Sequence, residues 1–370
     1  MTQDSPILSS AQTNPDPVAL TCDYLDQHAR PDWADCDLLI ARLCPNERST
    51  RNSIGTKSSA IKGSRPTVRS GIDLAWGLVS TLESHIDRRV GLFSTPRNVS
   101  RAMAGGLFEG NRSVAAVADP ASGYGSLLVA AVEAAQRAGS PMLADQLTGT
   151  DVRVENAAIS QASVWLALDQ PDIAPARFGA RDIISEGLPD IGADAAWLAN
   201  PPWGSNLRPD HVSAWKQRNR ELANVLEGSI DIFLLFLLEL VADEAQSAVI
   251  TPMQWMHRLS HTRARQWLAS NQRLRAVLTL RKGIFSAAPD VVPTISWWNA
   301  RTNPPSGPVR VAWTGWKATL PESGLLPVQR EGSLDPRDWT NAPFSVLPAL
   351  LDGAAGDDGM LQLMLGQASR

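Results

Sequence analysis

The chain has 370 residues, 44% of them hydrophobic, and a formal net charge of −4. This length supports one large domain with a smaller appendage, and the acidic balance is unusual for a protein that must grip a polyanion alone. The three cysteines, Cys22, Cys36 and Cys44, are odd in number and lack metal-ligand spacing, which argues against both a disulfide framework and a zinc site.

The first 87 residues are predicted to form a helical and partly flexible region. Short helices are expected at residues 18–29 and 33–43, and a stronger one at Gly71–Asp87. The stretch 48–69 is rich in Ser and Gly, and its cations form either a local basic patch or a solvated linker. The opening residues contain no apolar signal segment, so a cytoplasmic protein is expected.

A strand, a glycine turn and a helix are predicted on either side of residue 120. The apolar run Val114–Ala118 leads into the turn Asp119–Gly125, and a helical pattern then continues to about Ala138. Glycines in such a turn allow a ligand to approach the backbone closely. The third glycine of a dinucleotide fingerprint is replaced by Leu128, which argues against NAD and leaves room for another adenosine-containing ligand.

The tetrad Asn200, Pro201, Pro202 and Trp203 follows the strand-like run Ala195–Ala199. Two prolines fix the backbone and lack N–H groups, so the chain leaves the strand in one stiff conformation with its carbonyls available. The Asn side-chain oxygen and the Pro201 carbonyl can both accept hydrogen bonds from one amino group, while Trp203 offers a face for stacking. The alternative is that Pro-Pro only ends the strand and Trp203 only caps a core.

The rest of the chain continues an alternation of strands and helices. The apolar run Ile230–Val241 contains Asp231 and Glu239, is too short to span a bilayer and predicts a buried helix. Further elements are expected as strands at 248–251 and 274–280, a helix at 262–270 and a last apolar run at 291–298. This alternation predicts a doubly wound α/β sheet with mostly parallel pairing.

Two groups of cations are expected on the ligand-binding edge of this sheet, because each follows a predicted strand. The first comprises Arg208, Lys216, Arg218 and Arg220, and the second comprises His257, Arg258, Arg263 and Arg265.

Three segments together resemble one family. The sequence Gly91-Leu-Phe93-Ser-Thr95-Pro96, the turn at 119–125 and the tetrad at 200–203 resemble, in order and spacing, the motifs of the N6-adenine DNA methyltransferases, above all the modification subunits of type I restriction systems. The likeness covers roughly residues 88–300. It implies a seven-stranded class I S-adenosylmethionine-dependent methyltransferase sheet, with a final antiparallel strand, between a helical N-terminal region (1–87) and a short C-terminal extension (301–370).

The resemblance also implies roles for individual residues. The cofactor S-adenosylmethionine would contact Asp151 through its ribose hydroxyls, unless this acid is an ordinary helix N-cap, and Asp182 through its adenine amino group. Tyr124 and Ser122 depart from the family pattern, in which a small residue and a Cys are more frequent. The other implied cofactor contacts are Phe93, Thr95, Pro96, Asp119, Ala121, Gly123 and Gly125, and the implied catalytic residues are Asn200, Pro201, Pro202 and Trp203.

The expected reaction is direct methyl transfer to the N6 amino group of an adenine flipped out of DNA, without a metal or a membrane, in a restriction or phage-defence setting. About 70 residues after Ala300 are few for a sequence-reading domain. A specificity or partner subunit is therefore expected to select the target, or the protein has no DNA sequence specificity at all. Two other classes remain open. One is an amino methyltransferase acting on RNA, a protein amide or a small molecule, and the other is a non-catalytic scaffold.

Overall fold

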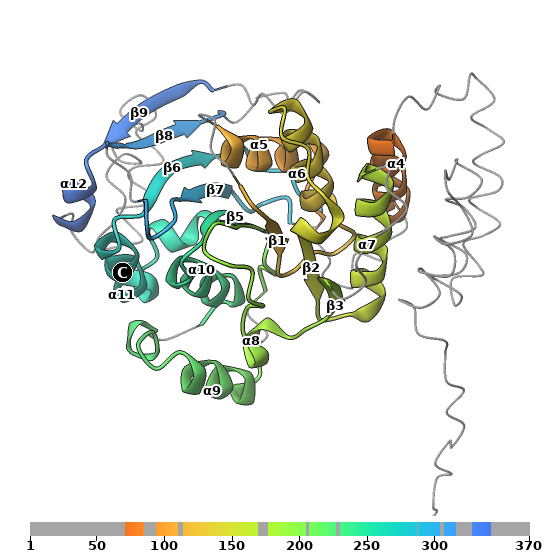
Figure 1. Ribbon diagram of the computed structural model, residues 1–370. Helices are drawn as coiled ribbons and strands as arrows, with labels where there is room; N and C mark the ends of the chain where they lie inside the picture. Colours follow the sequence, from red (N-terminus) through yellow and green to blue (C-terminus); the bar gives the residue numbers. More distant parts are fainter. Residues whose placement is uncertain are drawn as a thin grey trace, which may run out of the picture.

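A single β-sheet runs through the protein and carries helices on both faces (Figure 1). The computed structural model describes residues 71–84, 94–109, 114–168, 177–204, 207–226, 230–286, 288–303, 307–315 and 328–341. These residues form a sheet with the strand order β3-β2-β1-β4-β5-β7-β6-β8-β9. The strands are β1 (Val117–Asp119), β2 (Leu147–Asp151), β3 (Phe178–Ala180), β4 (Ala196–Ala199), β5 (Gln246–Pro252), β6 (Leu274–Thr279), β7 (Pro293–Trp298), β8 (Val309–Trp313) and β9 (Arg330–Leu334).

The α/β class is as predicted, but the sheet is larger and more mixed than the expected seven, mostly parallel strands. Nine strands are present among the described residues, and three of the pairings are antiparallel: β5 with β7, β6 with β7, and β8 with β9. The two additional strands come from the predicted C-terminal extension. β8 pairs in parallel with β6, and β9 then pairs with β8 to form the new edge of the sheet.

The half of the sheet that carries the sequence motifs is parallel throughout. β3, β2, β1, β4 and β5 run in the same direction, with Val117 of β1 opposite Leu147 of β2 and Ala196 of β4. The carboxyl ends of β1, β2 and β4 therefore meet at one edge. The antiparallel strand implied by the family resemblance is β7, which lies between β5 and β6.

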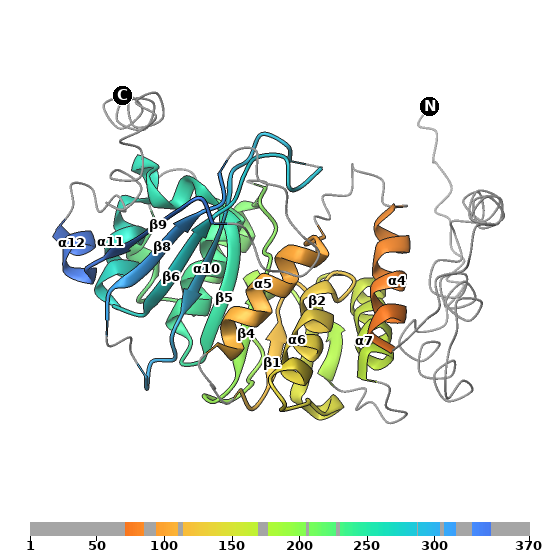
Figure 2. The same cartoon turned by 90° about the horizontal axis from the view of Figure 1, so that it is seen from above.

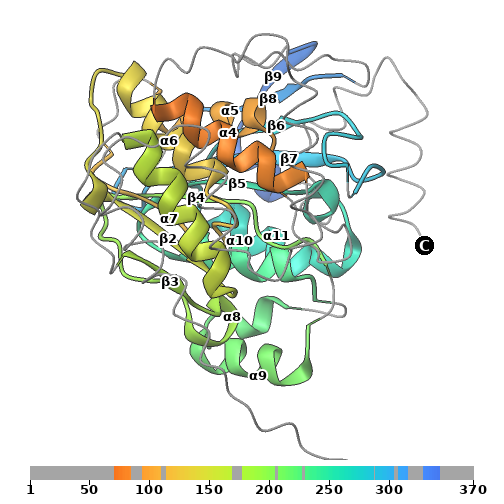
Figure 3. The same ribbon diagram turned by 90° about the vertical axis from the view of Figure 1, so that its right-hand side faces the viewer.

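Helices of two groups cover the two faces of the sheet (Figures 1 and 2). Figure 3 shows α4 lying against α6 and α7. The helices are α4 (Gly71–Ser84), α5 (Arg97–Phe108), α6 (Ser126–Arg137) and α7 (Val154–Leu168) on one face, and α8 (Ile183–Glu186), α9 (Pro209–Arg218), α10 (Ile232–Ala242), α11 (Thr262–Ser270) and α12 (Pro336–Asn341) with the other group.

Strand β4 shows how the two faces are filled. Ala196 and Leu198 belong to the core beneath α5, α6 and α7, whereas Trp197 and Ala199 belong to the core beneath α10 and α11. Alternate residues of a strand point to opposite faces, and a strand covered on both faces is apolar at every position. The run Ala-Trp-Leu-Ala, buried throughout, is such a strand.

The buried side chain of Arg273, immediately before β6, forms hydrogen bonds with carbonyl groups at the ends of three other elements, α10, β5 and β7. Its guanidinium donates to the carbonyl oxygens of Asn299 (2.7 Å), Asp243 (2.5 Å), Ala245 (2.6 Å) and Val241. These carbonyls lie in and just after the last turn of α10, just before β5 and just after β7. Burial lowers the pKa of Arg273 to about 10, so the group stays charged at neutral pH.

Most predicted elements lie close to their expected bounds. The buried helix predicted at Ile230–Val241 is α10, and the helix predicted at 262–270 is α11. Helix α4 begins at Gly71 as predicted; residues 85–87, the two short N-terminal helices and the stretch 48–69 lie outside the described residues. In the described part of the chain, every helix is too short or too polar to cross a lipid bilayer.

Candidate active site

A cavity of ≈ 360 Å³ opens at the carboxyl ends of β1, β2 and β4. It lies at the edge where an open parallel sheet usually binds its ligand, and its volume is within the range of about 300–1,000 Å³ typical of small-molecule sites. Among its lining residues are Thr95, Asp119, Ala121, Gly123, Asp151, Asp182, Asn200, Pro201 and Pro202. Three segments far apart in the sequence therefore share one cavity.

Both glycines of the turn between β1 and α6 have left-handed backbone conformations. Gly123 has φ 51° and Gly125 has φ 89°. A Cβ on Gly123 would meet nothing within 4 Å, so this position faces open space beside the cavity. A Cβ on Gly125 would lie 3.0 Å from Ser160 Oγ and 3.1 Å from Ser160 Cα. Gly125 therefore lies at a close contact with α7 and, unlike Gly123, is not a lining residue of the cavity.

Two carboxylates of the site, Asp119 and Asp151, are the last residues of the neighbouring strands β1 and β2. Asp119 is 2% exposed, and its Oδ1 accepts from the Ala121 N–H at 3.0 Å. Burial raises the pKa of Asp119 to about 8; the Ala121 hydrogen bond opposes this rise, and the nearby Asp151 adds to it. A cationic group of a ligand would stabilise the ionised form of this buried acid.

Asp151 ties the two ligand-facing loops together. Its Oδ2 accepts from Gly123 N–H at 3.1 Å, and its Oδ1 accepts from Arg153 N–H at 2.9 Å and Asn156 Nδ2 at 3.1 Å. Burial raises the pKa of Asp151, and these hydrogen bonds oppose the rise. The acid thus fixes the turn after β1 and the approach to α7 at once.

Asp182 lies on the same cavity and also caps a helix. Its Oδ1 accepts from the Ile184 N–H at 3.0 Å, and its Oδ2 accepts from Ser185 Oγ at 2.7 Å. It is the N-cap of the four-residue helix α8, whose residues Ile183 and Ile184 also line the cavity. The predicted contact of Asp182 with an adenine remains a prediction.

Asn200 leaves β4 and is joined to the segment before α5. Its Nδ2 donates to Thr95 Oγ1 at 3.0 Å, and the Thr95 carbonyl accepts from Ser100 Oγ at 3.1 Å. Pro96 is the N-cap of α5 and is absent from the cavity lining, and Phe93 lies outside the described residues.

Trp203 lies beside the cavity rather than among its lining residues. Its ring packs edge-on against Phe285, with centroids 4.5 Å apart and an interplanar angle of 68°. Phe285 lies between β6 and β7, far from the tetrad in sequence, and sequence analysis missed it because no local pattern marks it. The structure thus places Trp203 next to a second aromatic side chain.

Other lining residues also escaped sequence analysis. Val152 directly follows Asp151, lines the cavity and is 71% exposed, so its apolar side chain is available for contact with a flat ligand. The signal in the sequence that could have identified Val152 is its position directly after an acid at the end of a strand. The remaining lining residues missed include Ile183, Ile184, Leu207, His211, Ile232 and Phe236.

The two predicted groups of cations are only partly available to a ligand. Arg265 is fully buried, and its guanidinium donates to the carbonyls of Trp255 and Arg258. Arg258 pairs with Asp231 at 3.1 Å, and Arg218 pairs with Glu239 at 2.8 Å. Arg208 also pairs with an acid, Asp210, at 3.5 Å, but 67% of its side chain is exposed. The sequence alone could not distinguish cations that are bonded inside the protein from cations that are available to a ligand.

The lining suits an organic cation with a sugar and a flat ring. It offers buried acids, a glycine turn and apolar walls, and its amide and proline carbonyls accept hydrogen bonds from an amine. Within the described ranges, no group of three or more His, Cys, Asp or Glu side chains could hold a metal ion.

Comparisons with known proteins agree with this geometry. The family model described as N-6 DNA methylase matches residues 77–304. No curated protein matches the chain in sequence.

Several solved structures share the fold. The type I restriction-modification methyltransferase subunit from Streptococcus thermophilus is 17% identical, with a TM-score of 0.52 over 68% of this chain and 53% of that one. A putative class I S-adenosylmethionine-dependent methyltransferase from Listeria monocytogenes is 13% identical, with a TM-score of 0.52 over 80% and 92% of the two chains. The type ISP restriction-modification enzyme LlaBIII, bound to DNA, is 12% identical, with a TM-score of 0.53 over 89% and 29%. The chain spans about half the length of the Streptococcus subunit.

Proposed function

This chain belongs to the N-6 DNA methylase family, and on that premise we propose that it transfers a methyl group from S-adenosylmethionine to the N6 amino group of adenine in DNA. The observation that carries the proposal is one cavity lined by Asn200 and Pro201 together with Asp119, Asp151 and Gly123. An acceptor site for an amine thus adjoins a site suited to an adenosine-containing cation. We assign this activity to residues 88–300, flanked by an N-terminal region and a C-terminal extension.

Asn200 and Pro201 would act on the amino group of the acceptor. Because Asn200 Nδ2 donates to Thr95 Oγ1, the amide is oriented with its oxygen as the acceptor. The Pro201 carbonyl provides a second acceptor on a backbone that two prolines hold rigid. Two hydrogen bonds to one aromatic amine draw its nitrogen toward a tetrahedral geometry and expose its lone pair. Positioning and electrostatic complementarity supply the acceleration.

Trp203 and Phe285 would receive the displaced base. An adenine inside a duplex must leave the stack before its amino group can reach Asn200. Stacking on an aromatic ring offsets this loss by about 1–3 kcal/mol per base. The edge-on contact with Phe285 holds the Trp203 ring in place.

S-adenosylmethionine, when bound, supplies the activated methyl group. Each of three acids would contact a different part of this ligand: Asp119 lies beside the glycine turn, Asp151 ends β2 and Asp182 is the N-cap of α8. Thr95 and Ala121 complete the same lining. Pro96 and Gly125, which are next to lining residues in the chain, and Phe93, two residues before Thr95 in the sequence, are also assigned to the cofactor. Asp119, with a pKa of about 8, would ionise beside the cationic ligand.

We propose that a partner subunit selects the DNA sequence, in a restriction or phage-defence setting, and that the protein works in the cytoplasm. The net charge of −4 supports a partner, because an acidic chain gains little affinity from phosphate contacts by itself. The same charge favours the second candidate, an amino methyltransferase acting on RNA, a protein amide or a small molecule.

Transfer of a radiolabelled methyl group separates these candidates. The control variant is Asn271→Ala, because Asn271 is the C-cap of α11 and is absent from the cavity lining. Wild type, Asn200→Ala and Asn271→Ala would each be offered duplex DNA, single-stranded DNA, RNA and cell extract. We expect label in DNA as N6-methyladenine, with wild type and Asn271→Ala active and Asn200→Ala inactive although it binds the cofactor. Retained activity in Asn200→Ala would refute the mechanism. Label only in RNA, protein or metabolites would show that DNA is not the substrate and would support the second candidate. Cofactor binding without transfer to any acceptor would support a non-catalytic scaffold.

A further inference from the structure

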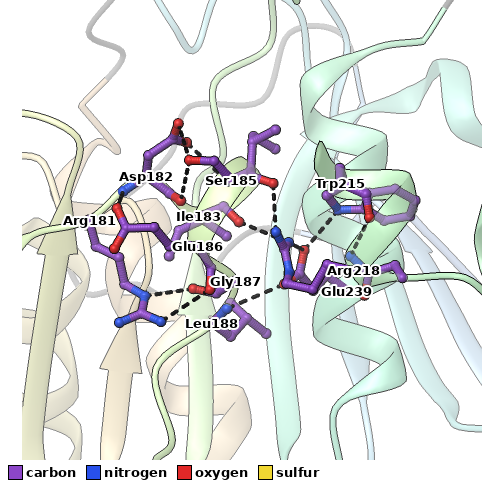
Figure 4. A network of polar contacts seen from close by, with 12 residues as sticks. Arg181, Asp182, Ile183, Ser185, Glu186, Gly187, Leu188, Trp215, Arg218 and Glu239 are labelled. Carbon is purple, nitrogen blue, oxygen red and sulfur yellow. Dashed lines mark hydrogen bonds and ion pairs between the residues drawn. The ribbon is translucent and has the colours of Figure 1, made fainter. Parts of the chain in front are cut away.

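Glu239 is a buried carboxylate with no place in the active site described above. It lies on α10, a helix otherwise built of apolar residues, and is 7% exposed. Its oxygens accept from Trp215 Nε1 at 2.8 Å, from the Leu188 N–H at 3.3 Å and from Arg218 Nη2 at 2.9 and 2.8 Å (Figure 4). A buried carboxylate with this many donors is held in one orientation.

The guanidinium of Arg218 connects this carboxylate to α8. While Nη2 contacts Glu239, Nη1 donates to the Ile184 carbonyl at 2.7 Å and Nη2 also donates to the Ile183 carbonyl at 3.0 Å. A planar guanidinium can hold acceptors in fixed directions, which an ammonium group cannot do. Arg218 lies at the end of α9, so α8, α9 and α10 meet at one ion pair.

Helix α8 depends on such contacts for its position. It has four residues, too few to be stable by itself. Its own segment is closed by Arg181 Nε, which donates to the Gly187 carbonyl at 2.6 Å, and by Glu186, which accepts from the Asp182 N–H at 2.9 Å (Figure 4). These local bonds shape the segment. The bonds from Arg218 and to Glu239, together with the burial of Ile183 and Ile184 in the core that contains Trp215, place it against α9 and α10.

The same segment forms one wall of the cavity. Asp182, Ile183 and Ile184 line it, and α9 reaches this wall at its other end too, where His211 Nε2 lies 3.9 Å from Asp182 Oδ2. We infer that Glu239 and Arg218 are positioning residues, which hold the wall formed by Asp182, Ile183 and Ile184 at the distance that the adenosine part of the cofactor requires. This inference rests on the proposed function, which assigns Asp182 to that part of the ligand.

A second buried carboxylate provides a matched control. Glu133 on α6 is also 7% exposed and accepts from Arg101, Arg137 and Trp76. These four residues are absent from the cavity lining. A change at Glu133 disturbs a buried charge network of similar size without touching the wall, so it measures the effect of lost stability alone.

The test compares Glu239→Gln and Arg218→Lys with Glu133→Gln. Glu239→Gln removes the negative charge and leaves at most one oxygen to accept from Arg218. Arg218→Lys keeps the positive charge but removes the planar guanidinium. Thermal unfolding without ligand would be followed by calorimetric titration with S-adenosylmethionine and with adenosine. We expect Glu239→Gln and Arg218→Lys each to raise the Kd of both ligands about tenfold. Glu133→Gln should lower the melting temperature and keep both Kd values within twofold of wild type.

The outcomes are distinct. Kd values within twofold of wild type in a folded Glu239→Gln or Arg218→Lys protein would overturn the inference and leave the proposed function intact. If Glu239→Gln does not fold, Arg218→Lys decides alone. A wild-type protein that binds neither ligand would overturn the proposed function and this inference with it. In active variants, KM for the cofactor should rise while kcat changes less than twofold, whereas a purely structural defect would lower the amount of active enzyme and leave KM unchanged.

Discussion

Asn200 Nδ2 donates a hydrogen bond of 3.0 Å to Thr95 Oγ1, a residue 105 positions earlier in the chain. This contact joins the tetrad after β4 to the segment before α5. Thr95 is itself held by Ser100, whose hydroxyl donates to its carbonyl. The orientation of the Asn200 amide is therefore set by α5 as well as by the strand that it follows.

Replacement of Thr95 by Val should slow methyl transfer by about 10- to 100-fold, because the isosteric side chain leaves the Asn200 amide without its acceptor. The Kd for S-adenosylmethionine should change much less. Single-turnover transfer on DNA and calorimetric titration measure the two effects. Thr95→Ser keeps the hydroxyl and should remain close to wild type; equal losses in the Val and Ser variants would contradict this role of the hydroxyl.

The stability of the protein should fall with rising pH because of Asp119. Its folded pKa of about 8 lies above the ordinary 3.8, so the folded state retains a proton that the unfolded state has lost. The free energy of unfolding therefore decreases between about pH 4 and pH 8. Asp119→Asn should remove this part of the slope and unfold at a higher temperature than wild type at pH 8.

The same variant should bind the positively charged cofactor more weakly at pH 8, because its amide cannot ionise. Thermal unfolding and titration across pH 5–9 provide both readouts. If the melting temperatures of wild type and Asp119→Asn change with pH in the same way over this range, Asp119 does not carry the raised pKa.

Gly125 should be less tolerant of a side chain than Gly139, although both have positive φ values of 89° and 74°. Gly139→Ala meets nothing within 4 Å and should lower the free energy of unfolding by about 1–2 kcal/mol through the backbone alone. Gly125→Ala should lower it by about 1–3 kcal/mol more, since its Cβ meets Ser160 at 3.0 Å. Denaturant unfolding of both variants is the measurement, and equal losses would refute the crowding at Gly125.

Trp203→Ala should weaken binding of a flipped base by about 1–3 kcal/mol, or roughly 5- to 150-fold. Fluorescence of 2-aminopurine placed at the target position reports the flipped state. Trp203→Phe retains an aromatic face and should keep most of the signal. Phe285→Leu removes the edge-on partner of Trp203 and should give an intermediate loss; a full signal in Trp203→Ala would exclude stacking on this ring.

The convergence of the motifs could be predicted from the sequence because it follows from strand direction. Asp119 and Asn200 each follow an apolar strand, and parallel strands bring their carboxyl ends to one edge. The helix α10 was equally evident, because an apolar run of this length can only be buried. Local pattern and sheet geometry were sufficient for these parts.

Other features depend on contacts that no local pattern contains. Strand β9 buries only Leu334 among its five residues, so it has no apolar alternation to reveal it. Arg265 looked like a ligand-binding cation, yet its charge is used on backbone carbonyls. His211 and Ile183 reach the cavity only because α8 and α9 fold against it.

The hydrogen bonds of Arg273 have a consequence for amide hydrogen exchange. Since one buried guanidinium joins the ends of α10, β5 and β7 to the start of β6, none of these elements can open without breaking bonds that the others share. Their amides should exchange slowly and with a common rate under conditions where exchange follows cooperative opening. Helix α8 is held instead by Arg218, whose side chain is 26% exposed. Protection that appears at α8 and α9 on addition of cofactor would thus stand out against a part of the sheet whose exchange does not change.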